Sequence, residues 1–269
     1  MHILVCVKEV IDPEIPSSAF RIDAATRTPD VAGAAYVTSV FDANALETGL
    51  KLRDAIGGTA SVSVLSIGKK SAELILRKAL GCSANAAVLV ADDAIVEPDP
   101  AGIATTIAAV VRKFAREGKP VDLVLTGRQA ADVEHGQTGG MLAEALGWPA
   151  LTFVSKMHPT ADGIEARREV EDGHMLVHAR PPFVVTITND ETNQPRLAKV
   201  RDVMMSNRAK IPAWSLADLE LTPADVTPRV RILELATSTR ENRCEFIDGD
   251  SPAAKADTLV ARLRELKLV

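Results

Sequence analysis

Apolar and polar positions alternate along the first part of the chain in blocks that predict strands and helices in turn. Short apolar runs have the length and branched side chains typical of buried parallel strands. They lie at His2–Val7, Ser61–Ile67, Ala86–Ala91, Leu123–Leu125 and Leu151–Val154. The longer stretches between them place apolar residues at three- and four-residue spacing, which predicts helices. This alternation indicates an α/β fold with a doubly wound, mostly parallel, Rossmann-like sheet.

Helix boundaries are marked by polar caps and glycines. Asp42 is the predicted N-cap of the first helix, which Gly57 ends. Later helices are expected over Ser71–Leu80, from Pro100 to Gly118, and from the glycine-rich stretch at Gly136 to Leu146, with Gly147 as its C-cap. Between the first strand and the first helix, the polar stretch Lys8–Pro29 is longer than a simple connection needs, which favours a functional or partner-facing loop.

The second half of the chain has a different pattern. Asp172-Gly173 between two alternating runs, Ile164–Val170 and His174–Arg180, predicts a β-hairpin, and Phe183–Thr188 predicts one further strand. Beyond Asn189 the chain is polar up to an amphipathic helix at Leu259–Leu268. We therefore expect an α/β domain over residues 1–190 and, over residues 191–269, an extended arm that packs on another subunit.

The order of the elements predicts where a ligand binds. If the strands have the common spatial order 3-2-1-4, the sheet has its switch point between the first and fourth strands. A ligand is then expected where Val5–Lys8 and Thr126–Arg128 end. The nearby sequence Gly136–Gly140 opens a helix, and its free N–H groups would suit a phosphate. Close packing of the helix on the sheet explains the same glycines equally well.

Composition narrows the class of protein. The chain has 269 residues, 46% of them hydrophobic but only 3% aromatic, and a net charge of −5 without a basic cluster, which disfavours nucleic acid and membrane partners. The N-terminus lacks the features of a signal peptide, so a cytoplasmic protein is expected. Cys6, Cys82 and Cys244 form no disulfide or metal motif, and no metal site is expected. Dinucleotide GxGxxG, P-loop and GxSxG motifs are missing, so we predict nucleotide binding without catalytic side chains.

Several sequence pieces carry a resemblance to a known family. They are VCVKEVID at Val5–Asp12, FDANALE at Phe41–Glu47, the long block Asp122–Pro149, and QPRLAKVRDVM at Gln194–Met204. In order and spacing they resemble the β subunit of electron transfer flavoprotein. The resemblance implies a heterodimer with an α subunit that holds most of the FAD. It also implies electron transfer from acyl-CoA-type or related flavin dehydrogenases to a membrane quinone oxidoreductase.

The resemblance also implies which residues line the β-subunit pocket, in which family members hold AMP. The implied cofactor-binding residues are Cys6, Ser39, Val40, Phe41, Asp42, Ile67, Gly127, Arg128, Gln129, Ala130, Ala131, Asp132, Val133, Glu134, His135, Gly136, Gln137 and Thr138. Partner recognition is expected at Arg196 and Val200. The chain departs from the family pattern at Ser39-Val40, in the loop Ala131–Gly136, and at Val200, which is smaller than the usual leucine.

Two alternatives remain open at this stage. Electron-bifurcating members of the family hold a second FAD in this pocket and oxidise NADH, and Phe41–Glu47 and the region of Trp214 resemble that type. Thr138 favours AMP, because its hydroxyl can donate to a terminal phosphate at the helix start. A nucleotide-binding regulatory module of universal-stress type has a similar fold, and a fold alone does not fix the function.

Overall fold

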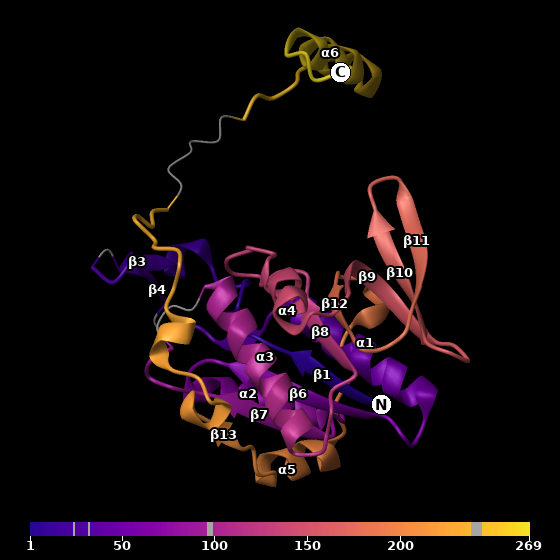
Figure 1. The fold of residues 1–269 in the computed structure, drawn as a ribbon. Coiled ribbons are helices and arrows are strands. Elements are labelled where there is room, and N and C mark those ends of the chain that lie inside the picture. The colour runs from indigo at the N-terminus through magenta and orange to yellow at the C-terminus, as the bar shows by residue number, and fades with distance from the viewer. Residues whose placement is uncertain (24, 32, 96–98, 238–243) are drawn as a thin grey trace. The chain divides into compact units, whose positions relative to one another are not determined.

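The structure, a computed structural model, describes residues 1–23, 25–31, 33–95, 99–237 and 244–269 (Figure 1). These residues divide into two compact units. The larger contains Met1–Phe20 and Asp30–Leu233, and the smaller contains Arg21–Pro29 and Glu234–Val269. The expected boundary at residue 190, between an α/β domain and an arm that packs on another subunit, stays a prediction.

A nine-stranded sheet forms the centre of the larger unit. Its spatial order is β11 (Gly173–Ala179), β10 (Ile164–Val170), β9 (Ala150–Pro159), β12 (Phe183–Ile187), β8 (Leu123–Gly127), β1 (His2–Cys6), β6 (Ser61–Ile67), β7 (Ala86–Val90) and β13 (Ala213–Trp214). In this spatial order, every pair of neighbouring strands between β9 and β13 is parallel. β10 pairs antiparallel with both β9 and β11. The order β7-β6-β1-β8 confirms the predicted arrangement 3-2-1-4, and the hairpin is confirmed as β10–β11.

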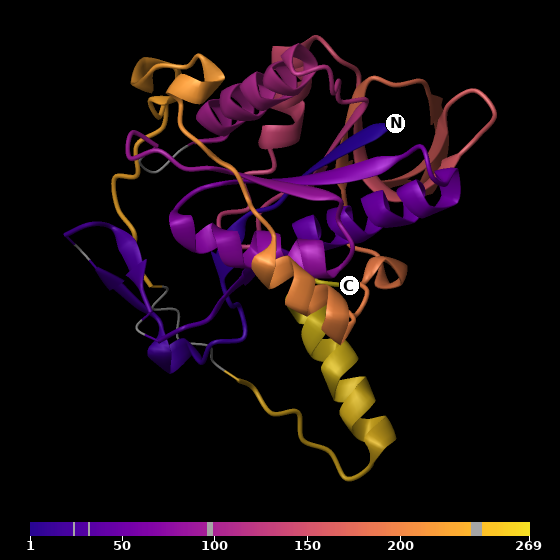
Figure 2. The ribbon, with the colours of Figure 1, turned by 90° about the horizontal axis from the view of Figure 1, so that it is seen from below.

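Helices cover both faces of the sheet (Figures 1 and 2). On one face, α1 (Val40–Ile56) and α2 (Glu73–Gly81) bury apolar side chains such as Leu50 and Leu76 against the strands. On the other face, α3 (Pro100–Arg116) and α4 (Thr138–Leu146) bury Ile107 and Leu142. The core consists mainly of Ala, Val, Leu and Ile, which is why the strands read as continuous apolar runs. The α/β prediction is confirmed.

The start of α1 differs from the prediction. The helix begins at Val40 with Ser39 as N-cap, so the assignment of Asp42 as the cap was wrong. Asp42 lies in the first turn, and its side chain is directed to the ends of β1 and β8 instead of to the helix amides. A short polar side chain near a helix start can bond either to the helix amides or to distant backbone, and only the tertiary contacts distinguish these two roles. Gly147 does end α4, with a left-handed φ of 66°.

The connection after β1 is more structured than its polar sequence suggested. β2 (Glu9–Ile11) pairs antiparallel with β5 (Tyr36–Thr38), and β3 (Arg21–Asp23) forms a small sheet with β4 (Thr28–Asp30). These strands have three residues each, which is too short to produce a recognisable alternation of apolar and polar positions.

Two α-helices follow β12 in the C-terminal part of the sequence. In the larger unit, α5 (Val200–Arg208) packs on α2. In the smaller unit, α6 (Pro252–Glu265) is capped by Ser251, whose hydroxyl accepts a hydrogen bond from the Ala254 amide at 3.2 Å. The predicted C-terminal helix is thus present, but it begins and ends earlier than the periodicity indicated. None of the residues of α6 is buried.

Candidate functional site

The candidate site lies at the carboxyl ends of β1 and β8, at the predicted switch point, and Asp42 joins the two strand ends. Its Oδ2 accepts a hydrogen bond from the Lys8 amide at 2.8 Å, and its Oδ1 accepts one from the Gly127 amide at 2.9 Å. Asp42 is only 7% exposed. Burial raises the pKa of this carboxyl to about 7, although the two N–H donors act in the opposite direction. Burial, followed by the nearby Asp42, also raises the pKa of the Cys6 thiol.

Side chains directly after β1 and at the N-cap of α1 also hold the loop that follows β8. The Lys8 ammonium forms an ion pair with Asp132, with Nζ and Oδ2 2.7 Å apart. Ser39 Oγ accepts a hydrogen bond from the Ala131 amide at 3.2 Å. Both contacts span more than 90 residues of sequence. The loop Arg128–Gln137 is therefore tied to the other side of the switch point.

Two glycines permit close approach of backbone at this site. A Cβ at Gly127 would lie 2.5 Å from Asp42 Oδ1 and 2.7 Å from Phe41 Cβ, so any larger residue would break the Asp42 bridge. A Cβ at Gly139, in the first turn of α4, would overlap the Thr186 side chain. At the neighbouring Gly140 the same position is open. Gly139 therefore serves close helix–sheet packing, which was one of the two explanations considered for the glycines.

The start of α4 retains properties that suit an anion. Gln137, at the N-cap position, makes no capping hydrogen bond with its side chain, so the first amides of the helix lack that acceptor. Beneath this turn, Thr126 is 5% exposed and its hydroxyl has no hydrogen-bond partner within the part of the chain that the structure describes. Uncapped amides and a buried hydroxyl without a partner fit a phosphate at the same position.

Arg128 lies between two aromatic rings at the edge of the site. Its guanidinium carbon is 4.7 Å from the centre of the Phe41 ring and 5.9 Å from that of Phe153. Its Nη1 donates to Thr188 Oγ1 at 3.4 Å, and its buried Nε has no partner among the described residues. Phe153 is 45% exposed. The site thus presents a guanidinium cation and an aromatic ring at the protein surface.

The predicted pocket residues come from four segments. Cys6 ends β1, Ile67 ends β6, Ser39 to Asp42 form the start of α1, and Gly127 to Thr138 run from β8 to the start of α4. The contacts described above join the α1 start to the loop after β8, and the parallel register places Cys6 beside Leu65 of β6. Residues 132–137 are exposed. The assignment of individual residues to a cofactor stays a prediction.

Arg196 and Val200, predicted to recognise a partner, have different environments. Val200 begins α5 and is 80% exposed. The guanidinium of Arg196 is directed toward α1, where it forms ion pairs with Glu47 and Asp54. Of these two residues, Val200 is the one whose side chain is available for contact with another protein.

Sequence reasoning placed Lys8 and Thr126 at the strand ends of the site but missed Phe153, Thr186 and Thr188. These three residues lie in β9, in β12 and directly after β12, and their positions depend on which strand pairs with β8.

Among the residues that the structure describes, no helix has the length and apolar character required to cross a membrane. The same residues contain no group of three or more His, Cys, Asp or Glu side chains arranged to hold a metal ion.

The fold defines a doubly wound α/β protein whose candidate site lies at the switch point of its sheet. Comparison with known proteins is more specific, because the electron transfer flavoprotein domain model matches residues 32–219. The chain is 36% identical to Protein FixA of Bradyrhizobium diazoefficiens over 95% of this chain and 89% of that protein. It is 31% identical to the electron transfer flavoprotein subunit beta of Clostridium acetobutylicum over 98% of both chains. It is also 31% identical to the caffeyl-CoA reductase-Etf complex subunit CarD of Acetobacterium woodii over the whole of both chains. The chain belongs to the electron transfer flavoprotein family.

Proposed function

We propose that the chain is the β subunit of an electron-carrying heterodimer in which an α subunit holds most of the FAD, and that its own pocket holds an adenine nucleotide. The feature that supports this best is the Asp42 bridge between the ends of β1 and β8, with the uncapped start of α4 beside it. Ligands of doubly wound sheets bind at this place. The flavin, when bound, supplies the redox chemistry, and protein groups position and tune it.

The pocket residues divide by chemistry. Thr138 and the first amides of α4 suit the phosphate, because they combine a hydroxyl donor with the positive end of the helix. Asp42, Ser39 and Lys8 hold the surrounding backbone in place. Arg128, fixed between the Phe41 and Phe153 rings, is a further cation available to an anionic ligand or partner.

AMP is the proposed occupant, and a second FAD is the alternative. AMP places its only phosphate at the end of the ligand, where the Thr138 hydroxyl and the helix amides can meet it. A second FAD would extend beyond its phosphates to an isoalloxazine ring, which requires further room. The similarity to a subunit of a caffeyl-CoA reductase-Etf complex is the reason to retain a second FAD as the alternative ligand.

Release of nucleotides from the purified heterodimer after denaturation tests the proposal. One FAD and one AMP per heterodimer are expected. Two FAD, together with NADH oxidation by the intact protein, would replace AMP by the bifurcating alternative. A nucleotide without any flavin would favour a regulatory module instead.

Thr138→Val tests the phosphate contact. The loss of one hydrogen bond to a charged phosphate is expected to weaken AMP binding by roughly 1–3 kcal/mol. AMP content is measured after dialysis, with Thr105→Val as the matched control, since Thr105 is a partly exposed helix threonine in α3, outside the pocket. Equal AMP retention by both variants would exclude the hydroxyl as a ligand.

We further propose that the surface around α5 receives a flavin dehydrogenase and that a quinone oxidoreductase accepts the electrons. Leu197, Val200 and Met204 are 96%, 80% and 57% exposed. Apolar side chains this exposed and this close in sequence are typical of a protein–protein contact.

A further inference from the structure

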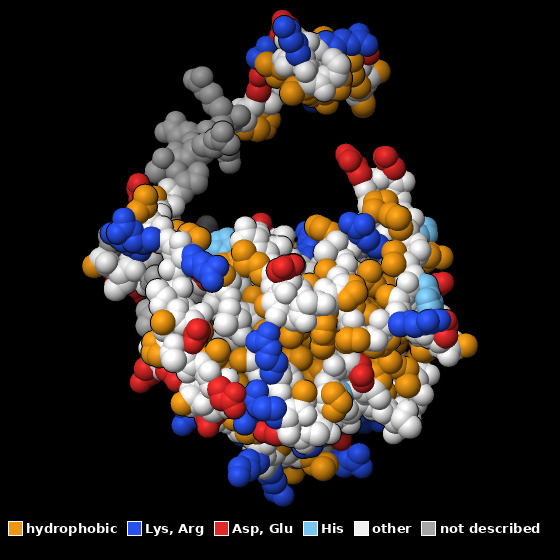
Figure 3. Space-filling view, in the orientation of Figure 1, with side chains coloured by type: hydrophobic (Ala, Val, Ile, Leu, Met, Phe, Trp, Pro, Cys, Tyr) orange, Lys and Arg blue, Asp and Glu red, His pale blue; other side chains and the backbone are white. Residues whose placement is uncertain are grey.

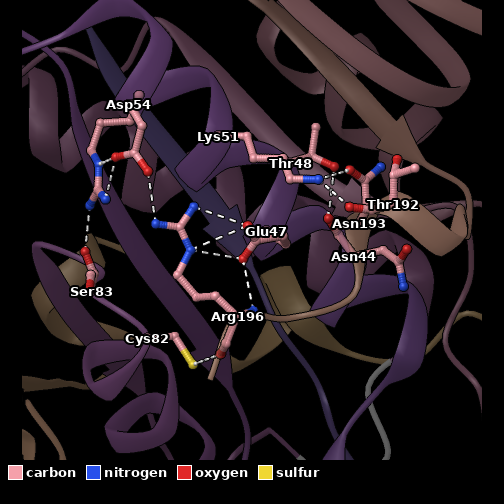
Figure 4. Close-up of polar contacts among 11 residues, drawn as sticks. Asn44, Glu47, Thr48, Lys51, Asp54, Cys82, Ser83, Thr192, Asn193 and Arg196 are labelled. Atoms are coloured by element: carbon pink, nitrogen blue, oxygen red, sulfur yellow. Dashed lines mark hydrogen bonds and ion pairs between the residues drawn. The ribbon is translucent and has the colours of Figure 1, made fainter. Parts of the chain in front are cut away.

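The segment that leads into α5 is held by one face of α1. The α1 residues Asn44, Glu47, Lys51 and Asp54 follow one another at three- and four-residue intervals, which places them in a row on one side of the helix (Figure 4). Each of them contacts the stretch from Asp190 to Arg196.

Glu47 is the centre of this row. It is 4% exposed, and its carboxylate accepts hydrogen bonds from three nitrogens of Arg196: the backbone amide at 3.1 Å, Nε at 3.0 Å and Nη2 at 3.0 Å. A planar guanidinium that meets a carboxylate along two of its N–H groups has a fixed orientation. Because the backbone amide binds the same carboxylate, the main chain at Arg196 is fixed together with its side chain.

Arg196 makes two more contacts on its other sides (Figure 4). Its Nη1 donates to Asp54 Oδ2 at 2.8 Å, and its carbonyl oxygen accepts a hydrogen bond from the Cys82 thiol at 3.4 Å. The hydrogen bonds that Arg196 donates to Glu47 and then to Asp54 raise the pKa of its guanidinium, so its charge is constant. The residue is held at its amide, its carbonyl and its guanidinium.

The preceding residues are tied down in the same way. Lys51 donates to the carbonyl oxygen of Thr192 and, at 3.2 Å, to Asn193 Oδ1. Asn193 in turn donates to the Ser155 carbonyl oxygen, and the Asp190 amide donates to Asn44 Oδ1 at 3.1 Å. Apolar packing is less complete here, since Pro195 lines a cavity of about 80 Å³ together with Leu46 and Ala79. The polar contacts therefore carry most of the positioning.

The exposed surface begins directly after Arg196, with Leu197 and then Val200 and Met204. At its far end α5 is held separately, because Arg77 of α2 donates to the carbonyl oxygens of Ser206 at 2.6 Å and Ala209 at 3.1 Å. Two arginines thus fix the two ends of a segment whose middle is exposed. Arg196 is the one adjacent to Leu197.

We propose that Arg196 is a positioning residue, which uses Glu47 and Asp54 to fix the exposed surface of Leu197, Val200 and Met204 for docking of a flavin dehydrogenase. This inference rests on the proposed function. It changes the role expected of Arg196, because the side chain acts through α1 and does not touch the partner. A segment that is already ordered before docking loses less conformational entropy on binding.

The test uses the assembled heterodimer and the variant Arg196→Lys, which keeps the charge but loses the two-pronged contact. Arg53→Lys is the matched control, because Arg53 contacts Asp54 from the same helix but not residues 190–196. Amide hydrogen exchange is measured without any dehydrogenase. Arg196→Lys is expected to speed exchange in residues 196–205 by about tenfold and to leave the hairpin β10–β11 unchanged. Unchanged exchange in residues 196–205 would overturn the proposal.

Docking is measured with a purified acyl-CoA dehydrogenase, by its affinity for the heterodimer. Arg196→Lys is expected to weaken the affinity about tenfold with FAD content unchanged. Leu197→Ala should have a clearly smaller effect in the Arg196→Lys background than in the wild type, because Arg196 acts through Leu197. Additive effects would show that Arg196 has only a general structural role. If the wild type does not bind the dehydrogenase, the proposed function fails, whereas the exchange result still decides whether Arg196 positions the segment.

Discussion

Asp42 is the residue on which the candidate site depends most directly. A buried carboxylate that joins two strand ends resists replacement, because its two N–H donors would lose their acceptors. Its place near the start of the first helix was predicted from the sequence, although as the N-cap. Its bridging role was not, because the two amides it meets lie 34 residues before and 85 residues after it.

The raised pKa of Asp42 predicts a pH dependence of stability. The pKa is about 7 in the folded protein, against an ordinary value of 3.8. The folded state therefore binds this proton more tightly than the unfolded chain, so the contribution of Asp42 to stability falls as the pH rises from about 4 to about 7. The full change is at most roughly 4 kcal/mol, at about 1.4 kcal/mol per pKa unit.

Denaturant unfolding at several pH values checks this expectation. Asp42→Asn cannot ionise, so its stability should decline less than that of the wild type over the same range. Parallel curves for the two proteins would mean that Asp42 is charged throughout. Thr138→Val, outside the bridge, should follow the wild type.

At the scale of elements, Gly139 allows α4 to pack closely on β12 and β8. Gly139→Ala would place a methyl group against Thr186 of β12 and 3.1 Å from Thr126 Oγ1. Overpacking of this kind is expected to destabilise the protein by about 1–3 kcal/mol. Gly140→Ala, one position along, meets open space and is expected to stabilise the helix by about 0.5–1 kcal/mol.

Unfolding free energies of the two alanine variants provide the measurement, and each serves as the control of the other. Opposite signs are expected from neighbouring glycines in one turn. A similar effect at both positions would show that helix propensity, and not packing on β12, decides the cost.

Elements with strong periodicity were predictable from the sequence, and those fixed by distant contacts were not. β6 was predicted to the residue, and the order β7-β6-β1-β8 agrees with the common order assumed for the alternating strands and helices. β12 was predicted as a strand, but its place between β8 and β9 depends on pairing that no local pattern encodes. For the same reason the contacts of Thr186 and Thr188 with the site could not be foreseen.

At the scale of the whole molecule, the larger unit exposes apolar side chains on the hairpin as well as on α5. Met175 and Leu176 of β11 are 50% and 62% exposed. Hydrophobic side chains gather over α4 and toward the hairpin in the space-filling view (Figure 3). A β subunit has an α-subunit partner, and this surface is the one we expect it to cover.

Leu176→Glu is therefore expected to weaken assembly with the α subunit by about 1 kcal/mol or more, because it places a charge in an apolar contact. Sedimentation of the two mixed subunits measures the effect. Leu74→Glu is the control, since Leu74 is 64% exposed but belongs to α2. An equal loss for both variants would indicate general destabilisation.

The position of β12 also bears on how the chain is made. A ribosome releases β8 first, then β9 and the hairpin, and only afterwards β12, which has every residue buried and lies between β8 and β9. Until residues 183–187 emerge, both β8 and β9 have a free edge in the growing chain. Free edges of apolar strands readily join other chains. The interval of synthesis between β9 and β12 is thus when a nascent chain has most need of a chaperone.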